Sequence, residues 1–96
     1  MFVLVTYDVN TQTAKSRRRL RRVAKVCESH GQRVQNSVFE CLLDPAQWVD
    51  LRGRLISEIN PEEDSLRFYL LGSNWRRRVE HVGAKASYDP EGPIVV

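Results

Sequence analysis

The chain has 96 residues, of which 42% are hydrophobic, and a formal net charge of +3. This length fits a single domain, and the ordinary apolar content argues against a disordered chain. No apolar run approaches the roughly 18 residues that a membrane-spanning helix needs, and the first residues lack the basic start and cleavage site of a signal peptide. We therefore expect a soluble, cytoplasmic protein with no membrane partner.

The first expected element is a strand over residues 2–8, which is apolar on both faces and so fits a central position in a sheet. It ends on Asp8, which is the only acid before Glu28. An ionised carboxylate at the end of an apolar strand needs a partner. Three partners are open: the N–H of Asn10 in an Asx turn, which is the commonest arrangement, an arginine of the following helix, or a hard cation.

A helix is expected over residues 14–30, with Thr11 or Thr13 as its N-cap and Gly31 as its stop. Apolar residues recur at helical spacing and should face the core: Leu20, Val23, Ala24 and Cys27. Basic residues occupy the opposite side and its flanks: Arg17, Arg18, Arg19, Arg21, Arg22 and Lys25.

The basic residues are clustered along the chain. Twelve of the 15 are arginine, residues 15–33 hold eight of them against one acid, and Arg76, Arg77 and Arg78 form a second cluster. The forked guanidinium of arginine suits phosphate oxygens. Such a run is usually a solvated helix face, but here few acids are interleaved with it, which favours a polyanionic partner.

The remaining elements complete an alternating order. Residues 32–43 predict two short strands with a turn or bulge at Asn36–Ser37. A helix over residues 44–59 should begin with Asp44 as N-cap, followed by strands at 65–71 and within 76–83. The order β-α-β-β-α-β predicts an α+β, ferredoxin-like sandwich over residues 1–82. The extension over residues 83–96 ends in an apolar tail that could pair with the sheet of another subunit.

A lone carboxylate is a poor magnesium site, yet Mg²⁺ commonly accepts one or two carboxylates and completes its shell with water and phosphate oxygens. A two-fold homodimer that brings two copies of Asp8 together would supply two. No other catalytic motif competes, because His30 and His81 lack partners at metal-binding spacing and no phosphate-binding glycine loop occurs. Phe39, beside polar residues, is the aromatic residue most expected to face a ligand.

Four segments together resemble a known family. They are "LVTYDVN" at 4–10, the Arg-rich helix, "RVQNSVFEC" at 33–41 and "DSLRFYLLG" at 64–72. They are similar to the small CRISPR-associated endonuclease, the non-integrase half of the spacer-acquisition complex. The resemblance runs to about residue 82, and "GAKASYDPEGPIVV" at 83–96 is similar to the I-C-like branch.

This resemblance implies a ferredoxin-like homodimer whose first-strand aspartates face each other and hold Mg²⁺, with Mn²⁺ as a replacement. It implies a metal-dependent endonuclease acting on double-stranded DNA or single-stranded RNA. The alternative is a non-catalytic scaffold that binds nucleic acid and bridges subunits of the CRISPR integrase. The implied residues are Asp8 for metal and catalysis with Tyr7 beside it, and Arg19, Arg21, Arg22, Arg33 and Phe39 for nucleic acid.

Overall fold

The structure is a computed structural model that describes residues 1–71 and 79–84. Its elements are β1 (Phe2–Asp8), α1 (Ala14–Glu28), β2 (Gln32–Gln35), β3 (Val38–Leu42), α2 (Pro45–Glu58), β4 (Ser65–Leu71) and β5 (Val79–Gly83). The expected elements are therefore present, within a residue or two at their ends. The predicted Arg76–Arg78 cluster and the tail at 85–96 lie outside the described residues.

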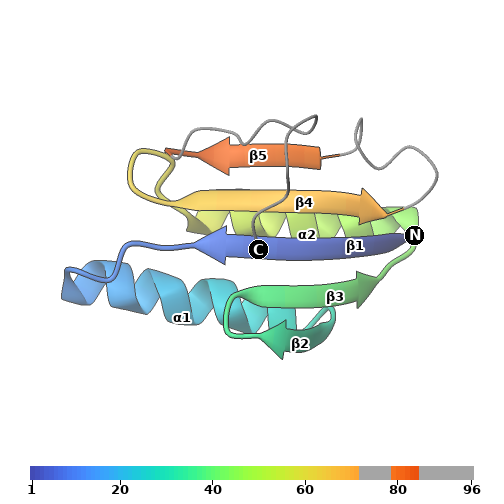
Figure 1. Ribbon diagram of the computed structural model, residues 1–96, viewed down its shortest axis with the longest axis horizontal. Helices are drawn as coiled ribbons and strands as arrows, with labels where there is room; N and C mark the ends of the chain where they lie inside the picture. Colours follow the sequence, from blue (N-terminus) through green and yellow to red (C-terminus); the bar gives the residue numbers. More distant parts are fainter. Residues whose placement is uncertain (72–78, 85–96) are drawn as a thin grey trace.

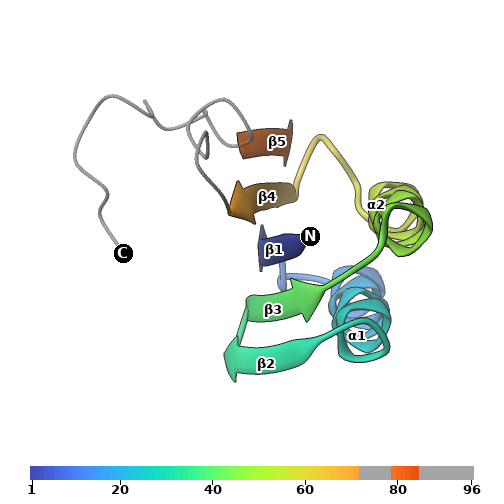
Figure 2. The ribbon, with the colours of Figure 1, turned by 90° about the vertical axis from the view of Figure 1, so that its right-hand side faces the viewer.

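The five strands form one sheet in the order β2-β3-β1-β4-β5, and each neighbouring pair is antiparallel. The central position predicted for the first strand is confirmed, because β1 lies between β3 and β4 (Figure 1). Both helices pack on the same face of this sheet (Figure 2). The α+β, ferredoxin-like fold predicted from the order of elements is confirmed, with β5 added beside β4.

Capping residues fix where the two helices begin. Thr13 is the N-cap of α1, and its side chain and that of Ser16 each accept the backbone N–H of the other residue. Asp44 and Gln47 form the same reciprocal pair at the start of α2, with a proline in the first turn. After α1, Gly31 is required by a close approach, since a Cβ there would overlap the sulfur of Cys41.

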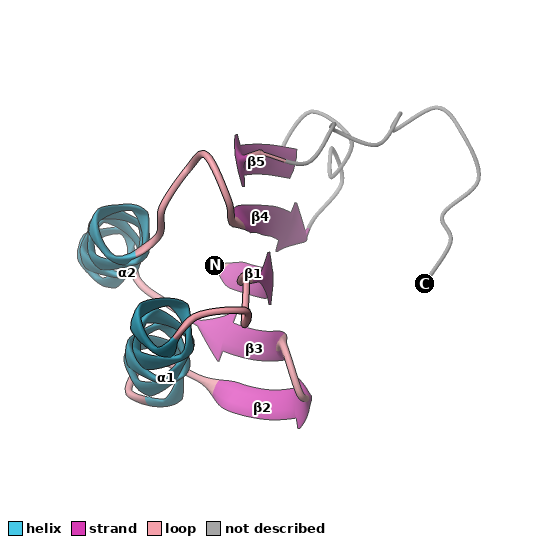
Figure 3. Cartoon of the chain, turned by 90° about the vertical axis from the view of Figure 1, so that its left-hand side faces the viewer, coloured by secondary structure: helices cyan, strands magenta, loops and turns pink. Residues whose placement is uncertain are grey.

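The residues of β1 alternate between two different environments. Val3, Val5 and Tyr7 are buried beneath the helices. The intervening Phe2, Leu4 and Thr6 are only partly buried, and Asp8 is exposed. A strand turns successive side chains to opposite faces, so Asp8 lies on the face that the helices leave uncovered (Figure 3).

We call this second surface the open face. Residues directly opposite each other on paired strands share a face, which gives its members from the register. They are Phe2, Leu4, Thr6 and Asp8 of β1, Val38, Glu40 and Leu42 of β3, and Ser65, Arg67, Tyr69 and Leu71 of β4. The core lies on the other side of the sheet, between it and the helices. Neither helix in the described part of the chain is long and apolar enough to cross a membrane.

Candidate metal and nucleic-acid site

Asp8 is the last residue of β1, is exposed on the open face, and lies opposite Ser65 of β4. The Asx-turn interpretation assigned the N–H of Asn10 to this carboxylate. In the structure that N–H donates to Asp64 Oδ1 at 3.0 Å, and the Asn10 side chain itself accepts the N–H of Gln12 at 2.8 Å. The Asx turn is therefore formed by Asn10, two residues later than expected, and Asp8 lies at the surface.

The donor set at Asp8 fits one part of a magnesium shell. Within residues 1–71 and 79–84, no three His, Cys, Asp or Glu side chains gather closely enough to hold an ion. Magnesium is a hard cation that takes carboxylate oxygen and commonly accepts only one or two carboxylates from protein. Asp8 contributes one exposed carboxylate at this strand end, so a complete site needs further oxygen ligands.

Tyr7 does not lie beside the Asp8 carboxylate, although the two residues are adjacent in sequence. Its side chain is 6% exposed and faces the helices, and its hydroxyl donates to the carbonyl of Asn36 at 3.3 Å. Its ring stacks against that of Phe39, with centroids 6.2 Å apart. Burial raises the pKa of Tyr7, which keeps the phenol protonated. The structure thus gives Tyr7 a packing role and a hydrogen bond to the turn between β2 and β3.

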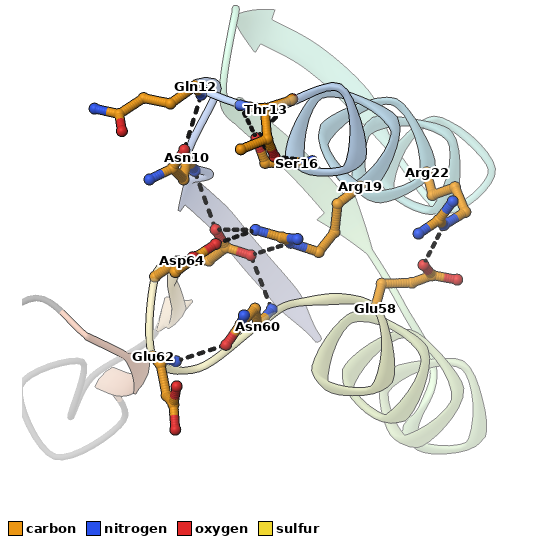
Figure 4. A network of polar contacts seen from close by, with 11 residues as sticks. Asn10, Gln12, Thr13, Ser16, Arg19, Arg22, Glu58, Asn60, Glu62 and Asp64 are labelled. Carbon is orange, nitrogen blue, oxygen red and sulfur yellow. Dashed lines mark hydrogen bonds and ion pairs between the residues drawn. The ribbon is translucent and has the colours of Figure 1, made fainter.

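A buried ion pair lies behind the end of β1. Arg19 donates from Nε to Asp64 Oδ2 at 2.7 Å and from Nη2 to Asp64 Oδ1 at 3.2 Å. Asp64 Oδ2 also accepts the N–H of Asn60 at 2.8 Å, and Arg19 reaches Glu63 at 3.0 Å. Figure 4 shows the Asp64 carboxylate surrounded by donors from α1, from the segment after β1 and from the loop before β4. Both charges are hydrogen-bonded on several sides.

Hydrogen bonding decides the ionisation of Asp64. Burial by itself raises the pKa of this carboxyl, because a low-dielectric environment disfavours the charged form. The hydrogen bonds from Arg19 and from the N–H groups of Asn60 and Asn10 outweigh that effect and hold the pKa below its ordinary value. Asp64 is therefore an anion at neutral pH in spite of its complete burial.

A basic groove runs along the exposed side of α1. It encloses about 560 Å³ and is lined by Arg18, Arg21, Arg22, Ala24, Lys25, Glu28 and Arg33. Two of its arginines carry acid partners: Arg33 pairs with Glu28 at 2.9 Å and Arg22 with Glu58 at 2.8 Å. Several guanidinium groups around one open depression suit the phosphates of a nucleic-acid backbone.

Two of the residues expected to contact nucleic acid are buried instead. Phe39 has 0% exposure because its strand position faces the helices, and the guanidinium of Arg33 covers its ring at 4.9 Å from the centroid. Arg19 has 7% exposure because it shares the inward side of α1 with Val23 and Cys27. Phe39 packs the core and Arg19 neutralises Asp64, so neither presents its side chain to a ligand in this structure.

The basic groove and Asp8 lie on opposite sides of the sheet. The groove is formed by α1 and by Arg33, whose register partner Phe39 points toward the helices. Asp8 belongs to the open face. Of the residues predicted to form one site, the structure groups Arg21, Arg22 and Arg33, and separates them from Asp8 within a single chain.

Asp64 and Glu28 matter at these sites, but the sequence analysis assigned neither of them a role. Helical spacing could have pointed to Asp64. Position 19 lies on the same side of the helix as Val23 and Cys27, and a buried arginine there needs an acidic partner. Asp64, directly before the strand at 65–71, was the available partner. Glu28 is the only acid in the basic stretch, and its pairing with Arg33 across Gly31 depends on the turn that joins α1 to β2.

Comparison with known proteins places this geometry among relatives. Residues 1–79 match the family described as CRISPR associated protein Cas2. The chain is 65% identical over 96 residues to the CRISPR-associated endoribonuclease Cas2 of Chlorobaculum tepidum, covering 100% of both chains. It is 54% identical to the CRISPR-associated endonuclease Cas2 of Halalkalibacterium halodurans, covering 99% of both. The crystal structure of Streptococcus pyogenes Cas2 at pH 6.5 superposes with a TM-score of 0.70 and 63% identity, covering 86% of this chain and 100% of that one.

Proposed function

The chain belongs to the CRISPR-associated Cas2 family, and on this premise we propose that it is a magnesium-dependent endonuclease of CRISPR spacer acquisition. Relatives bear the names endoribonuclease and endonuclease, so the substrate class we propose is single-stranded RNA or double-stranded DNA. The observation that carries the proposal is the exposed carboxylate of Asp8 at the end of the central strand, on a face that the chain's helices leave uncovered. The assignment to the I-C-like branch stays a prediction.

We place the second carboxylate in a second copy of the chain. The open face carries apolar side chains, among them Leu42 at 77% and Leu71 at 43% exposure, which a monomer would leave in water. A small domain gains stability when a partner covers such a surface. Because Asp8 lies on this same face, we place the axis of the two-fold homodimer where the two Asp8 side chains approach each other.

Each residue then has a defined task. Asp8 from each chain would hold the metal, Mg²⁺ or Mn²⁺, through carboxylate oxygen. When bound, the ion would supply charge neutralisation at the phosphate and a water of lowered pKa. Arg21, Arg22 and Arg33 bind the nucleic-acid backbone away from the cleaved bond. The rings of Tyr7 and Phe39 stack on the helix side of the sheet and fix the packing of β1.

Substitution of Asp8 tests the nuclease. Asp8→Asn keeps the size of the side chain and removes its charge, so we expect the variant to lose cleavage of duplex DNA and of single-stranded RNA. Adding a chelator to the wild type should abolish cleavage in the same way. Nucleic-acid affinity and dimer mass, measured by fluorescence anisotropy and light scattering, should be unchanged. Cleavage that persists in rigorously purified Asp8→Asn protein would locate the activity elsewhere.

The separation of the basic groove from Asp8 favours a second candidate function, a non-catalytic scaffold that binds nucleic acid and bridges the CRISPR integrase. A groove on the far side of the sheet can bind a backbone without presenting it to Asp8 of the same chain. The same variant separates the two functions. If Asp8→Asn supports integrase association and spacer integration as well as the wild type does, the scaffold role accounts for the protein in that complex and its cleavage is dispensable there.

A further inference from the structure

The buried Asp64 is connected to Asp8 by two routes. Its side chain accepts the N–H of Asn10, two residues beyond Asp8, at 3.0 Å. Its backbone continues directly into Ser65, which is the register partner of Asp8 in the pairing of β1 with β4. In Figure 4 the carboxylate lies where the chain leaves β1. One residue therefore restrains both the chain that follows Asp8 and the strand that lies beside it.

Asp64 is itself fixed from several directions. The fork of Arg19 approaches from α1 and the N–H of Asn60 from the loop before β4. Its backbone carbonyl accepts the N–H of Ala84, just after β5, at 2.8 Å. The close approach of β5 requires Gly83, which has a φ of 128° and whose Cβ would overlap that carbonyl oxygen. Three segments of the chain thus hold the carboxylate of Asp64, and a fourth holds its backbone carbonyl.

Stability alone does not explain this arrangement. A buried ion pair is often no more stabilising than apolar side chains of the same volume. Apolar side chains, however, could not accept the N–H groups of Asn10 and Asn60. The two oxygens of the Asp64 carboxylate each accept a backbone N–H near the strand end, and the strand end carries the proposed metal ligand.

We propose that Asp64 and Arg19 are positioning residues for Asp8: together they set the path of the chain on either side of it and so orient its carboxylate toward the metal. The inference rests on the proposed function, since it concerns the same carboxylate. Neither residue contacts metal or nucleic acid in this role. Arg19 therefore acts inside the fold, as a counter-ion that keeps the acceptor in place.

The test replaces the pair without leaving a lone buried charge. The double variant Arg19→Gln/Asp64→Asn removes both charges, whereas either single change would strand the other. Its matched control is Arg52→Gln/Glu80→Gln. In the wild type, Arg52 of α2 donates two hydrogen bonds of 2.7 Å to the carboxylate of Glu80 in β5. Arg19→Lys retains the charge but loses the fork.

Two quantities are measured well below the unfolding temperature of each variant. The first is the dissociation constant of magnesium, obtained by titrating magnesium chloride and following the amide NMR signals of residues 8–10. The second is the cleavage rate at saturating nucleic acid. For Arg19→Gln/Asp64→Asn we expect magnesium binding weakened roughly tenfold and the rate lowered at least as much, as when groups that orient a metal ligand are lost. Arg19→Lys should retain part of the magnesium affinity and part of the cleavage rate. The control variant should match the wild type in both.

The outcomes distinguish this inference from the proposed function. If Arg19→Gln/Asp64→Asn unfolds at a lower temperature but binds magnesium and cleaves as the wild type does, the pair is only structural and the inference is overturned. If the wild type binds magnesium at Asp8 without cleaving, and the variant weakens that binding, the inference stands and the nuclease proposal fails. If magnesium leaves the wild-type signals of residues 8–10 unchanged, both fail.

Discussion

At the scale of single residues, the basic groove contains one carboxylate that competes with its expected ligand. Glu28 pairs with Arg33 at 2.9 Å, and the two side chains are 55% and 40% exposed. An acid in this position occupies a guanidinium that a phosphate would otherwise use, and repels the phosphate as well. The groove in the free protein is therefore partly neutralised by its own chain.

Glu28→Gln should consequently bind nucleic acid more tightly. Because an exposed ion pair is worth about 0.2–1 kcal/mol, we expect affinity to rise by a factor of roughly 1.4 to 5. The log–log dependence on salt should steepen by about 0.9 if one more phosphate is neutralised. Fluorescence anisotropy over a range of salt concentrations measures both.

Glu62→Gln is the control for this change, since it removes the same charge from an exposed residue outside the groove. An equal gain in the two variants would show a general charge effect and would contradict a specific role for Glu28. If Glu28→Gln binds nucleic acid no more tightly than the wild type, the groove is not the surface that contacts nucleic acid.

At the scale of elements, the pair of Asp64 with Arg19 joins α1 to the ends of β1 and β4. Its contribution to stability has a definite sign with pH. The folded pKa of Asp64 is held below its ordinary value, so the unfolded chain takes up a proton first as the pH falls. The stabilisation is fully present above the unfolded pKa of about 3.9 and is lost progressively below it.

Acid unfolding measures this contribution. The free energy of unfolding of the wild type, from urea titrations at a series of pH values, should fall steeply below about pH 4. In Arg19→Gln/Asp64→Asn the free energy of unfolding should fall less steeply. This variant lacks Asp64, whose pKa is lower in the folded than in the unfolded state. Parallel curves for the two proteins would show that Asp64 does not have the depressed pKa assigned to it.

At the scale of the whole molecule, the proposed homodimer depends on the open face. Leu4 lies at its centre, between Glu40 and Tyr69 in the strand register. Leu4→Lys places a charge in the proposed interface, where a like charge from the second copy would face it, so we expect the protein to shift to monomers in light scattering. Cleavage should fall with the dimer fraction, because each chain brings one Asp8.

Val49→Lys is the matched control, since Val49 is 69% exposed on α2, on the other side of the molecule. It should leave dimer mass and cleavage unchanged. A Leu4→Lys protein that remains dimeric and active would place the interface on another surface.

Local physical signals determined much of this protein from its sequence. The apolar pattern of residues 2–8 predicted a central strand, and the order of elements predicted the sheet with its helices. The predicted N-caps were Asp44 and either Thr11 or Thr13, of which the structure has Asp44 and Thr13. Exposed arginines at 18, 21 and 22 followed from helical spacing alone. The quoted segments identified the family, which the comparisons confirm. These features depend on neighbours within a few residues, which the sequence shows directly.

Only the tertiary structure decided which charged side chains meet. Arg19 and Asp64 are separated by 45 positions, and Asn10 and Asp64 by 54, so no local pattern predicts that they share one buried cluster. Whether Phe39 faces the core or a ligand depended on which side of the sheet both helices cover. Burial of a charge is decided by partners that folding brings from distant segments, and this is why the sequence placed Asp8 correctly at a strand end yet could not identify the residues around it.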